Sequence, residues 1–203
     1  MDGWRQRLQK GQQFGRSWSP NSKYVVYFDG KDWNSISIPD LKITNLTSKL
    51  KTRFAREDHD TPSAAPSYGI AGWTTDDREV LIYDKYDIWQ ISPDGGGKNL
   101  TGGIGRREKT ALRYVRLDPD ERSIDPEKVL LLNADNEETR DLGFYRVKIG
   151  NTPEKLLMRA KNCGNPTKAK DGDTVMFTAS RFDTFPDLWV SALDFKSPKR
   201  LSD

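Results

Sequence analysis

The sequence contains a single cysteine, Cys163, and a single histidine, His59. One cysteine excludes a disulfide within the chain and any metal site built from clustered thiolates, and it leaves the compartment open. The sequence also lacks an apolar run of 18 residues, and residues 1–15 carry charges without an apolar centre. We therefore expect no membrane-spanning helix in this sequence and no signal peptide in residues 1–15.

Motifs for nucleophilic catalysis and for phosphate binding are missing as well. The sequence nearest to the G-x-S-x-G turn of serine hydrolases is GRSWS at 15–19, which fails at its last position and precedes a predicted strand. The glycine-rich stretch at 94–108 contains Lys98, but Asn99 follows where a phosphate-binding loop needs Ser or Thr. This stretch predicts a hairpin turn. We expect no catalytic residue, no metal site and no cofactor in this chain.

The composition is polar for a folded chain, with 34% hydrophobic and 31% charged residues. Six Trp, seven Tyr and eight Phe nevertheless supply large side chains for a core, which disordered segments usually lack. The net charge of +3 is the difference between 33 basic and 30 acidic residues. Neither basic stretch, at 49–56 or at 105–109, is interleaved with aromatic residues in the way of a nucleic-acid-binding surface, so we expect no nucleic-acid partner.

Four stretches of the sequence share one pattern, in which a polar turn, a short apolar strand, a polar loop and a second, alternating strand follow one another. The predicted apolar strands are Tyr24 to Phe28, Val80 to Tyr83, Val129 to Leu132 and Val175 to Phe177. The predicted second strands are Ser35 to Ile38, Asp87 to Ile91, Gly143 to Val147 and Asp187 to Leu193. We interpret the stretches as four copies of one structural unit.

Alignment of the second strands places four large side chains at one position, with spacings of 53, 56 and 44 residues: Ile36, Trp89, Tyr145 and Trp189. Three copies end on a Leu-Thr or Leu-Ser step, at 46–47, 100–101 and 201–202. Strand repeats of about this length are typical of β-propellers, in which such side chains pack between neighbouring blades. The sequence predicts an all-β propeller segment of about four blades, near residues 18–54, 68–104, 112–158 and 166–203, after an N-terminal segment at 1–17.

Two segments, 48–58 and 152–161, have a composition that also suits a helix. In the second of them Leu156, Leu157 and Met158 are consecutive, and the segment follows a strand where the other copies have a strand-ending turn. We expect no helix in either segment, with a helix as the alternative.

The chain resembles the N-terminal propeller of the S9 family of serine peptidases, which includes prolyl oligopeptidases and dipeptidyl or acylaminoacyl peptidases, and in particular large bacterial members. The resembling residues are WSPNSKYVVYFD from Trp18, YGIAGWTTDDREVLIYDKYDIWQISPDGGGKNLT from Tyr68 and DLWVSAL from Asp187. The resemblance covers nearly the whole chain, from Trp18 to Asp203. The SPDG turn followed by Asn-Leu-Thr is shared with TolB-like and other WD40-like propellers.

The resemblance implies that the catalytic Ser, Asp and His lie on an α/β-hydrolase domain, and no residue of this chain matches them. It implies a non-catalytic part of a peptidase, which gates access to that hydrolase site and helps to shape it. The implied partners are the hydrolase domain and a peptide substrate, and the implied location is the bacterial cell envelope, periplasmic or secreted. The family propeller has seven or eight blades, so about four blades leave open edges, at which self-association is possible.

A second interpretation is a stand-alone module of the TolB or WD40-like type that binds a protein or a glycan. Such a module needs a strand that joins the first blade to the last. Residues 4–14 are too charged and too poor in β-branched residues to form that strand convincingly.

Five charged residues are candidates for substrate binding. Glu57, Asp58 and Asp60 surround His59 in a predicted loop, and such carboxylates either bind a hard cation or a substrate ammonium group, or are simply solvated. Arg106 and Arg107 either meet a substrate carboxylate or the hydrolase domain, or are exposed on the surface.

Four further acidic residues are expected to be structural: Asp76, Asp77, Asp84 and Asp87. Asp side chains at turns accept hydrogen bonds from nearby backbone N–H groups, and the D-x-D-x-D-G pattern of a calcium loop is missing. Cys163 is interpreted as a passive thiol, because no second Cys or His accompanies it.

Overall fold

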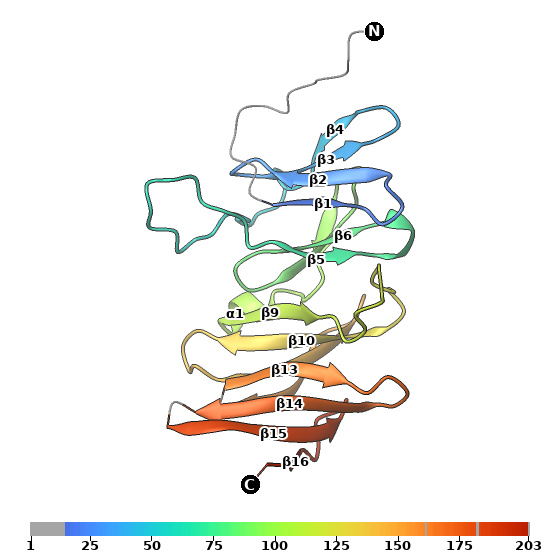
Figure 1. Cartoon of the computed structure of the whole chain (residues 1–203). Coiled ribbons are helices and arrows are strands. Elements are labelled where there is room, and N and C mark those ends of the chain that lie inside the picture. The colour runs from blue at the N-terminus through green and yellow to red at the C-terminus, as the bar shows by residue number, and fades with distance from the viewer. Residues whose placement is uncertain (1–14, 161, 182, 203) are drawn as a thin grey trace.

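The computed structural model describes residues 15–160, 162–181 and 183–202. Within them sixteen strands form four sheets, each of four antiparallel strands in sequential order. The sheets follow one another along the chain and lie stacked from the first described strand to the last (Figure 1). This arrangement confirms the predicted all-β propeller segment of four blades. Most of the predicted N-terminal segment 1–17 lies outside the described residues.

The first sheet contains β1 (Arg16–Trp18), β2 (Tyr24–Phe28), β3 (Trp33–Ser37) and β4 (Ile43–Asn45). The second contains β5 (Ile70–Trp73), β6 (Val80–Tyr83), β7 (Ile88–Ile91) and β8 (Gly97–Asn99). The third contains β9 (Thr110–Val115), β10 (Val129–Asn136), β11 (Leu142–Lys148) and β12 (Glu154–Arg159). The fourth contains β13 (Asn162–Lys168), β14 (Thr174–Arg181), β15 (Thr184–Ala192) and β16 (Lys199–Arg200). Two short helical turns are η1 (Thr75–Asp77) and α1 (Ile104–Arg107).

The predicted strands coincide with strands of these sheets, and β2 and β6 have the predicted bounds. The first strands of three sheets begin ahead of the predicted blade limits, at Arg16, Thr110 and Asn162. The segment 152–161 contains strand β12, and the segment 48–58 forms turns and a bridge between Ala55 and Ser67, so neither is helical in its described residues. The glycine-rich stretch at 94–108, for which only a hairpin turn was predicted, also contains a helical turn, α1.

A hydrogen-bonded tie recurs in three sheets and explains the Leu-Thr or Leu-Ser step. The hydroxyl oxygen of Thr47 accepts the N–H of Trp33 at 2.9 Å, and the hydroxyl donates to Asp32 at 2.9 Å. The same pair of hydrogen bonds joins Thr101 to Ile88 and Asp87, and Ser202 to Leu188 and Asp187. Each tie fastens the last strand of a sheet to the start of its third strand, because one hydroxyl bonds both groups.

These ties define the register of the copies, which differs from the predicted one. The residues that follow the tied amides are Asn34, Trp89 and Trp189. Ile36 therefore does not share the position of Trp89 but lies two residues further on, at the position of Ile91. In the third sheet the N–H of Asn136 donates to the carbonyl of Asp141, as the N–H of Asp84 donates to the carbonyl of Asp87 in the second sheet. Asp141 therefore matches Asp87. It follows that Gly143 takes the position of Trp89 and Tyr145 that of Ile91.

Gly143 cannot carry a large ring in the third sheet. A Cβ atom built at this residue would lie 1.9 Å from the carbonyl oxygen of Leu157 on the adjacent strand β12. The register between β11 and β12 shifts next to it, between Phe144 and Tyr145. The close approach of the two backbones thus requires glycine at the position that Trp89 and Trp189 occupy in the second and fourth sheets.

Among the described residues the core consists of three apolar clusters, one between each pair of neighbouring sheets. Trp89 packs between the first and second sheets, Tyr145 between the second and third, and Trp189 between the third and fourth. Ile36 lies on the face of the first sheet that points away from the second, because it alternates with the inward-facing Ser35 and Ser37 along β3. Each internal sheet therefore buries both of its faces.

Candidate functional site

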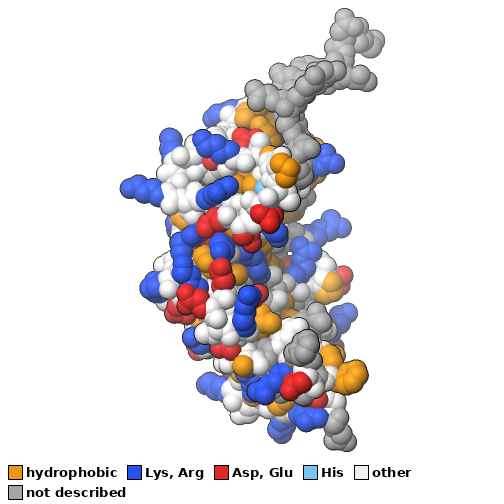
Figure 2. All heavy atoms as spheres, turned by 90° about the vertical axis from the view of Figure 1, so that its left-hand side faces the viewer, with side chains coloured by type: hydrophobic (Ala, Val, Ile, Leu, Met, Phe, Trp, Pro, Cys, Tyr) orange, Lys and Arg blue, Asp and Glu red, His pale blue; other side chains and the backbone are white. Residues whose placement is uncertain are grey.

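Several connections lie together at one end of the stack, which we call the loop end: the hairpins at 28–33, 83–88 and 136–141 and the segments 46–69 and 100–109. The segment 46–69 projects sideways from this end (Figure 1). It is anchored by Phe54, which is buried and lies 5.8 Å from Trp89 between ring centroids, and by Tyr68, whose hydroxyl accepts the N–H of Glu57 at 2.7 Å. Figure 2 faces this end and shows basic and acidic side chains intermingled on it.

Two of the five candidate residues meet at the loop end. Arg106 Nη2 lies 2.7 Å from Glu57 Oε1 and 3.9 Å from Asp84 Oδ2. The guanidinium group also lies 5.2 Å from the ring centroid of Tyr86, a distance at which the cation is attracted to the ring face. The hydrogen bond from Arg106 to Glu57 raises the pKa of Arg106 above its usual value. The ion pair thus joins the projecting segment 46–69 to α1.

The other three candidate residues, Asp58, Asp60 and Arg107, are exposed. His59 Nε2 lies close to the hydroxyls of Thr61 and Ser63, at 2.9 and 3.2 Å. Within the described residues no group of three His, Cys, Asp or Glu side chains is arranged to hold a metal ion. The five residues therefore do not form one site, and their role as substrate contacts stays a prediction.

A cluster of charged residues surrounds Tyr86, which was not predicted from the sequence. Its hydroxyl donates to Glu137, which also accepts a hydrogen bond from Lys85 Nζ at 3.0 Å. Lys85, Arg106 and Lys109 lie 5.1, 5.2 and 5.6 Å from the ring centroid of Tyr86. The hydrogen bonds from Tyr86 and Lys85 lower the pKa of Glu137. The only signal in the sequence was the run of charged and aromatic residues in DKYD at 84–87, which gave no hint of the distant Glu137.

Buried carboxylates hold the turns beneath this cluster. Asp84 accepts the N–H groups of Tyr86 and Asp87 at 2.8 and 2.7 Å and the indole N–H of Trp89 at 2.9 Å. Asp87 accepts the N–H groups of Gly105 and Arg106 at 3.0 and 3.1 Å. The structural role predicted for these two Asp residues is confirmed. Asp77 is similarly buried, and it bonds the Ser19 hydroxyl of the first sheet at 2.6 Å.

Arg113 fills the space between the loop end and the second sheet. Its guanidinium group donates to the carbonyl oxygens of Asp84 and Lys85 at 3.0 and 2.8 Å and lies 4.6 Å from the ring centroid of Tyr83. Burial lowers the pKa of Arg113. Since its donors are turned to backbone carbonyls, this arginine fixes the turn rather than facing a ligand.

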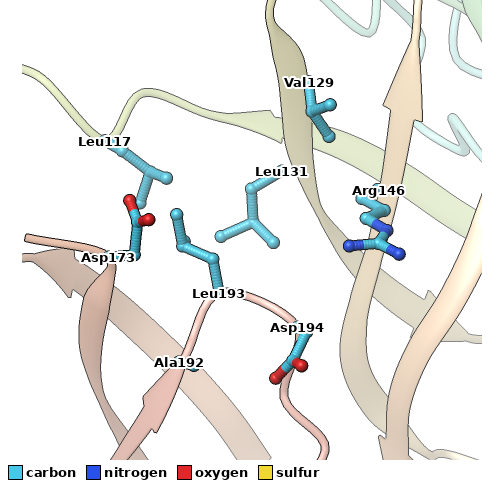
Figure 3. Close-up of a pocket in the computed structure, with 8 residues that line it drawn as sticks. All are labelled: Leu117, Val129, Leu131, Arg146, Asp173, Ala192, Leu193 and Asp194. Atoms are coloured by element: carbon cyan, nitrogen blue, oxygen red, sulfur yellow. The ribbon is translucent and has the colours of Figure 1, made fainter.

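A cavity of 390 Å³ lies at the opposite end of the stack, between the third and fourth sheets. Figure 3 shows Leu117, Leu131 and Leu193 converging on it, with the carboxylates of Asp173 and Asp194 beside them. Arg146 also lines the cavity and is paired with Glu154 at 2.8 Å. The arrangement can accept an apolar group that carries a positive charge.

No protein-family model and no curated protein matches the chain. Among solved structures the chain is similar to TolB from Acinetobacter baumannii, with 15% identity over 95% of this chain and 44% of that chain and a TM-score of 0.49. It is similar to the calcium-binding protein regucalcin from Agrobacterium tumefaciens, with 14% identity over 93% of this chain and 58% of that chain and a TM-score of 0.47. A structure from a study of two prolyl endopeptidases has 9% identity over 93% of this chain and 42% of that chain, with a TM-score of 0.31.

The chain thus spans less than half of that TolB chain. We draw no functional argument from similarities of this size. The fold assignment rests on the four sheets and on the hydrogen-bonded tie that recurs within three of them. In the described residues, no helix is both long enough and apolar enough to cross a membrane.

Proposed function

We propose that this chain is the non-catalytic propeller segment of an S9-like serine peptidase, and that its loop end restricts access to a hydrolase site on another domain. The observation that carries the proposal is the ion pair between Glu57 and Arg106, which holds a projecting segment against the end of the sheets. The sequence GWTTDDREVLIYDKYDIW at 72–89, which is more specific to the resemblance than the SPDG turn, contains Asp84 and Tyr86, and both lie next to Arg106 of this pair.

A gate needs a rigid base and a polar rim, and both are supported by contacts of the loop end. Buried Asp84 and Asp87 fix the turns by accepting hydrogen bonds from seven donors: the N–H groups of Tyr86, Asp87, Gly105 and Arg106, the indole N–H of Trp89 and the hydroxyls of Thr52 and Thr101. Above them the charges of Glu57, Glu137 and Lys85 are paired. Such a surface suits a contact with another domain, because interfaces between domains are more polar than protein cores.

The pairing also refines the role of the two arginines. A substrate carboxylate would have to displace Glu57 from Arg106, whereas exposed Arg107 is accessible without any rearrangement. Under the proposal Arg106 maintains the position of the gate, and Arg107 is the arginine available to a substrate or to the hydrolase domain.

The parentage is tested in the source cells with an antibody raised against this chain. The precipitated protein is treated with a fluorophosphonate probe, which reacts with the nucleophilic serine of serine hydrolases. We expect a labelled band well above the 23.2 kDa of this chain. An unlabelled band at the mass of the chain would overturn the proposal and favour a stand-alone TolB- or WD40-like binding module.

The gating role is tested in the labelled parent protein by comparing cleavage of a short and a long peptide. Arg106→Met removes the ion pair that holds Glu57, so the tip of the segment 46–69 should move more freely and kcat/KM for the long peptide should rise by up to about two-fold relative to that for the short one. Lys31→Met is the control, because Lys31 is an exposed cation in the hairpin 28–33 at the same end and has no assigned role in the bridge or in binding, and it should leave the ratio unchanged. Equal ratios in wild type and Arg106→Met would contradict the gate.

A further inference from the structure

The first sheet has an apolar row on the face that points away from the rest of the stack. Cross-strand pairing aligns Trp18 with Val25, Val25 with Ile36, and Ile36 with Ile43, one residue from each strand. Trp18 is 62% exposed and Ile43 is 55% exposed. Side chains that are paired across adjacent strands lie on one face of a sheet, so the four form a continuous apolar band.

This row repeats positions that are buried between sheets elsewhere in the molecule. Trp18 pairs with Val25 in the first sheet as Trp73 pairs with Val80 in the second. Trp73 is only 3% exposed, because it packs on the first sheet with its ring stacked 6.2 Å from that of Tyr24. Trp18 is therefore the exposed copy of a residue that joins one sheet to the preceding one.

The fourth sheet has the complementary exposed face. Leu201 donates its N–H to the carbonyl of Leu188, as Leu46 does to Trp33 and Leu100 does to Ile88. Leu46 and Leu100 are 3% and 5% exposed, since each faces the following sheet, but Leu201 is 58% exposed. Met176, which pairs with Val190 on the same outward face, is also exposed.

We propose that the chain associates with a second copy of itself, the fourth sheet of each copy packing on the first sheet of the other. The chain already makes this kind of contact three times, between its own neighbouring sheets. One outward face carries the residues that pack on a preceding sheet, and the other carries those that pack on a following sheet. The second copy thus supplies the complement of both faces.

Two such contacts related by a two-fold axis give a closed assembly. Eight sheets, four from each copy, lie within the usual range of propeller sizes. Contacts between unlike faces form either closed rings or open polymers, depending on the rotation between copies. The dimer is that of the four-sheet chain as a separate molecule, because within a longer peptidase further sheets of the same propeller would cover the two outward faces. The probe experiment above and the mass measurement below can therefore fail separately.

The association is tested on the purified full chain by sedimentation velocity and light scattering over a range of concentrations. We expect a species of twice the 23.2 kDa of one chain. A monomer at high micromolar concentration would overturn the proposal. This holds also if the fluorescence of wild type, compared with that of Trp18→Phe, shows that Trp18 is shielded from solvent within the monomer. A continuous series of larger polymers would also overturn it, because the contacts would then not close.

Two substitutions identify the faces. Trp18→Lys places a charge on the first sheet and Met176→Lys on the fourth, and each should weaken dimerisation at least about 30-fold, as loss of a central interface residue does. Phe185→Lys is the matched control: Phe185 is 94% exposed but belongs to neither row, so it should leave dimerisation unchanged. Circular dichroism melting curves check that each variant is folded.

Mixing the two defective variants tests whether unlike faces meet. In a mixed dimer the intact fourth sheet of Trp18→Lys can pack on the intact first sheet of Met176→Lys, so one of the two contacts is restored. The mixture should therefore dimerise more tightly than either variant alone. Failure of the mixture to recover, or a loss of dimer with only one of the variants, would indicate contacts between like faces and overturn the proposal.

Discussion

The second and third sheets build the same four-stranded unit in different ways. The strands of the second sheet have three or four residues, and buried Asp84 and Asp87 hold its turns. The strands of the third sheet have six to eight residues. At the position of Asp87 the third sheet has Asp141, which is only half-buried. Short strands with buried carboxylates and long strands with more ladder hydrogen bonds thus reach the same arrangement.

The two sheets are therefore sensitive to different substitutions. Removing one carboxylate of the second sheet leaves several buried donors without acceptors, which is costly in the protein interior. The third sheet has no equivalent carboxylate to lose, and its sensitive point is instead the close backbone contact at Gly143.

The largest effect is expected for Asp87→Ala in the second sheet. The substitution removes the acceptor for the hydroxyl of Thr101 and for the N–H groups of Gly105 and Arg106. The free energy of unfolding should fall by about 4 kcal/mol, since each unsatisfied buried donor costs about 1–3 kcal/mol. Urea denaturation measures it, with exposed Asp94→Ala as the control. A loss no larger than that of the control would show that the carboxylates do not hold this sheet.

Gly143→Ala should have the next largest effect, and it acts on the third sheet. The added methyl group collides with the carbonyl of Leu157, so β11 and β12 must separate. We expect a loss of about 3 kcal/mol in the free energy of unfolding, as in other overpacked sites. Gly172→Ala is the matched control, because a Cβ atom there meets nothing within 4 Å. Equal stability of the two variants would contradict the close contact.

A smaller effect is expected from the ionisation of Tyr83, whose side chain packs between the second and third sheets. Burial raises the pKa of Tyr83 to about 12, from about 10 in an unfolded chain. The folded state therefore favours the neutral phenol, and this stabilisation is complete below pH 10 and is lost as the pH rises toward 12.

Tyr83→Phe removes this ionising group. Between pH 9 and pH 11 the free energy of unfolding of wild type should therefore fall by about 1 kcal/mol more than that of Tyr83→Phe. Denaturant titrations at the two pH values measure the difference. Tyr27→Phe, on the outward face of the first sheet, should alter the pH dependence less. Parallel pH profiles for wild type and Tyr83→Phe would show that the phenol of Tyr83 ionises equally in both states.

The smallest effect is expected for Glu57→Gln at the loop end. The ion pair with Arg106 is partly exposed, and such pairs contribute about 0.5 kcal/mol or less after solvent screening. Thermal unfolding should change little, whereas proteolysis within segment 46–69 should become faster because the segment is released. Asp58→Asn, on the same segment but outside the pair, is the control. Unchanged proteolysis would contradict the anchoring role of the pair.

The positions of the sheets could be predicted from the sequence, but their mutual register could not. Strands such as Val80 to Tyr83 are buried on both faces, so they are recognisable in the sequence as short continuous apolar runs. The misalignment of Ile36 with Trp89 has a simple cause. Side chains in a strand alternate with a period of two, so a shift by two residues keeps each side chain on the same face and leaves the pattern unchanged. Hydrogen bonds between strands, such as those of Thr47 and Thr101, distinguish the two registers.

Residues of the candidate site could be predicted from the sequence, but the contacts between them could not. Glu57 and Arg106 were both singled out, but their contact spans 49 residues and depends on how Phe54 and Tyr68 anchor the segment between the first two sheets. The partnership of Tyr86 with Glu137 spans 51 residues and has no local signature. Contacts of this kind come from the packing of complete sheets, which residue patterns do not encode locally.

Cys163 can report how often one boundary between sheets opens. It is the sole thiol of the sequence, and it is buried in the cluster between the third and fourth sheets. A thiol reagent can reach it only when these two sheets part, so the rate of labelling under native conditions counts the openings at this one boundary. Comparison of that rate with global unfolding would tell whether the last sheet detaches on its own or only when the whole stack comes apart.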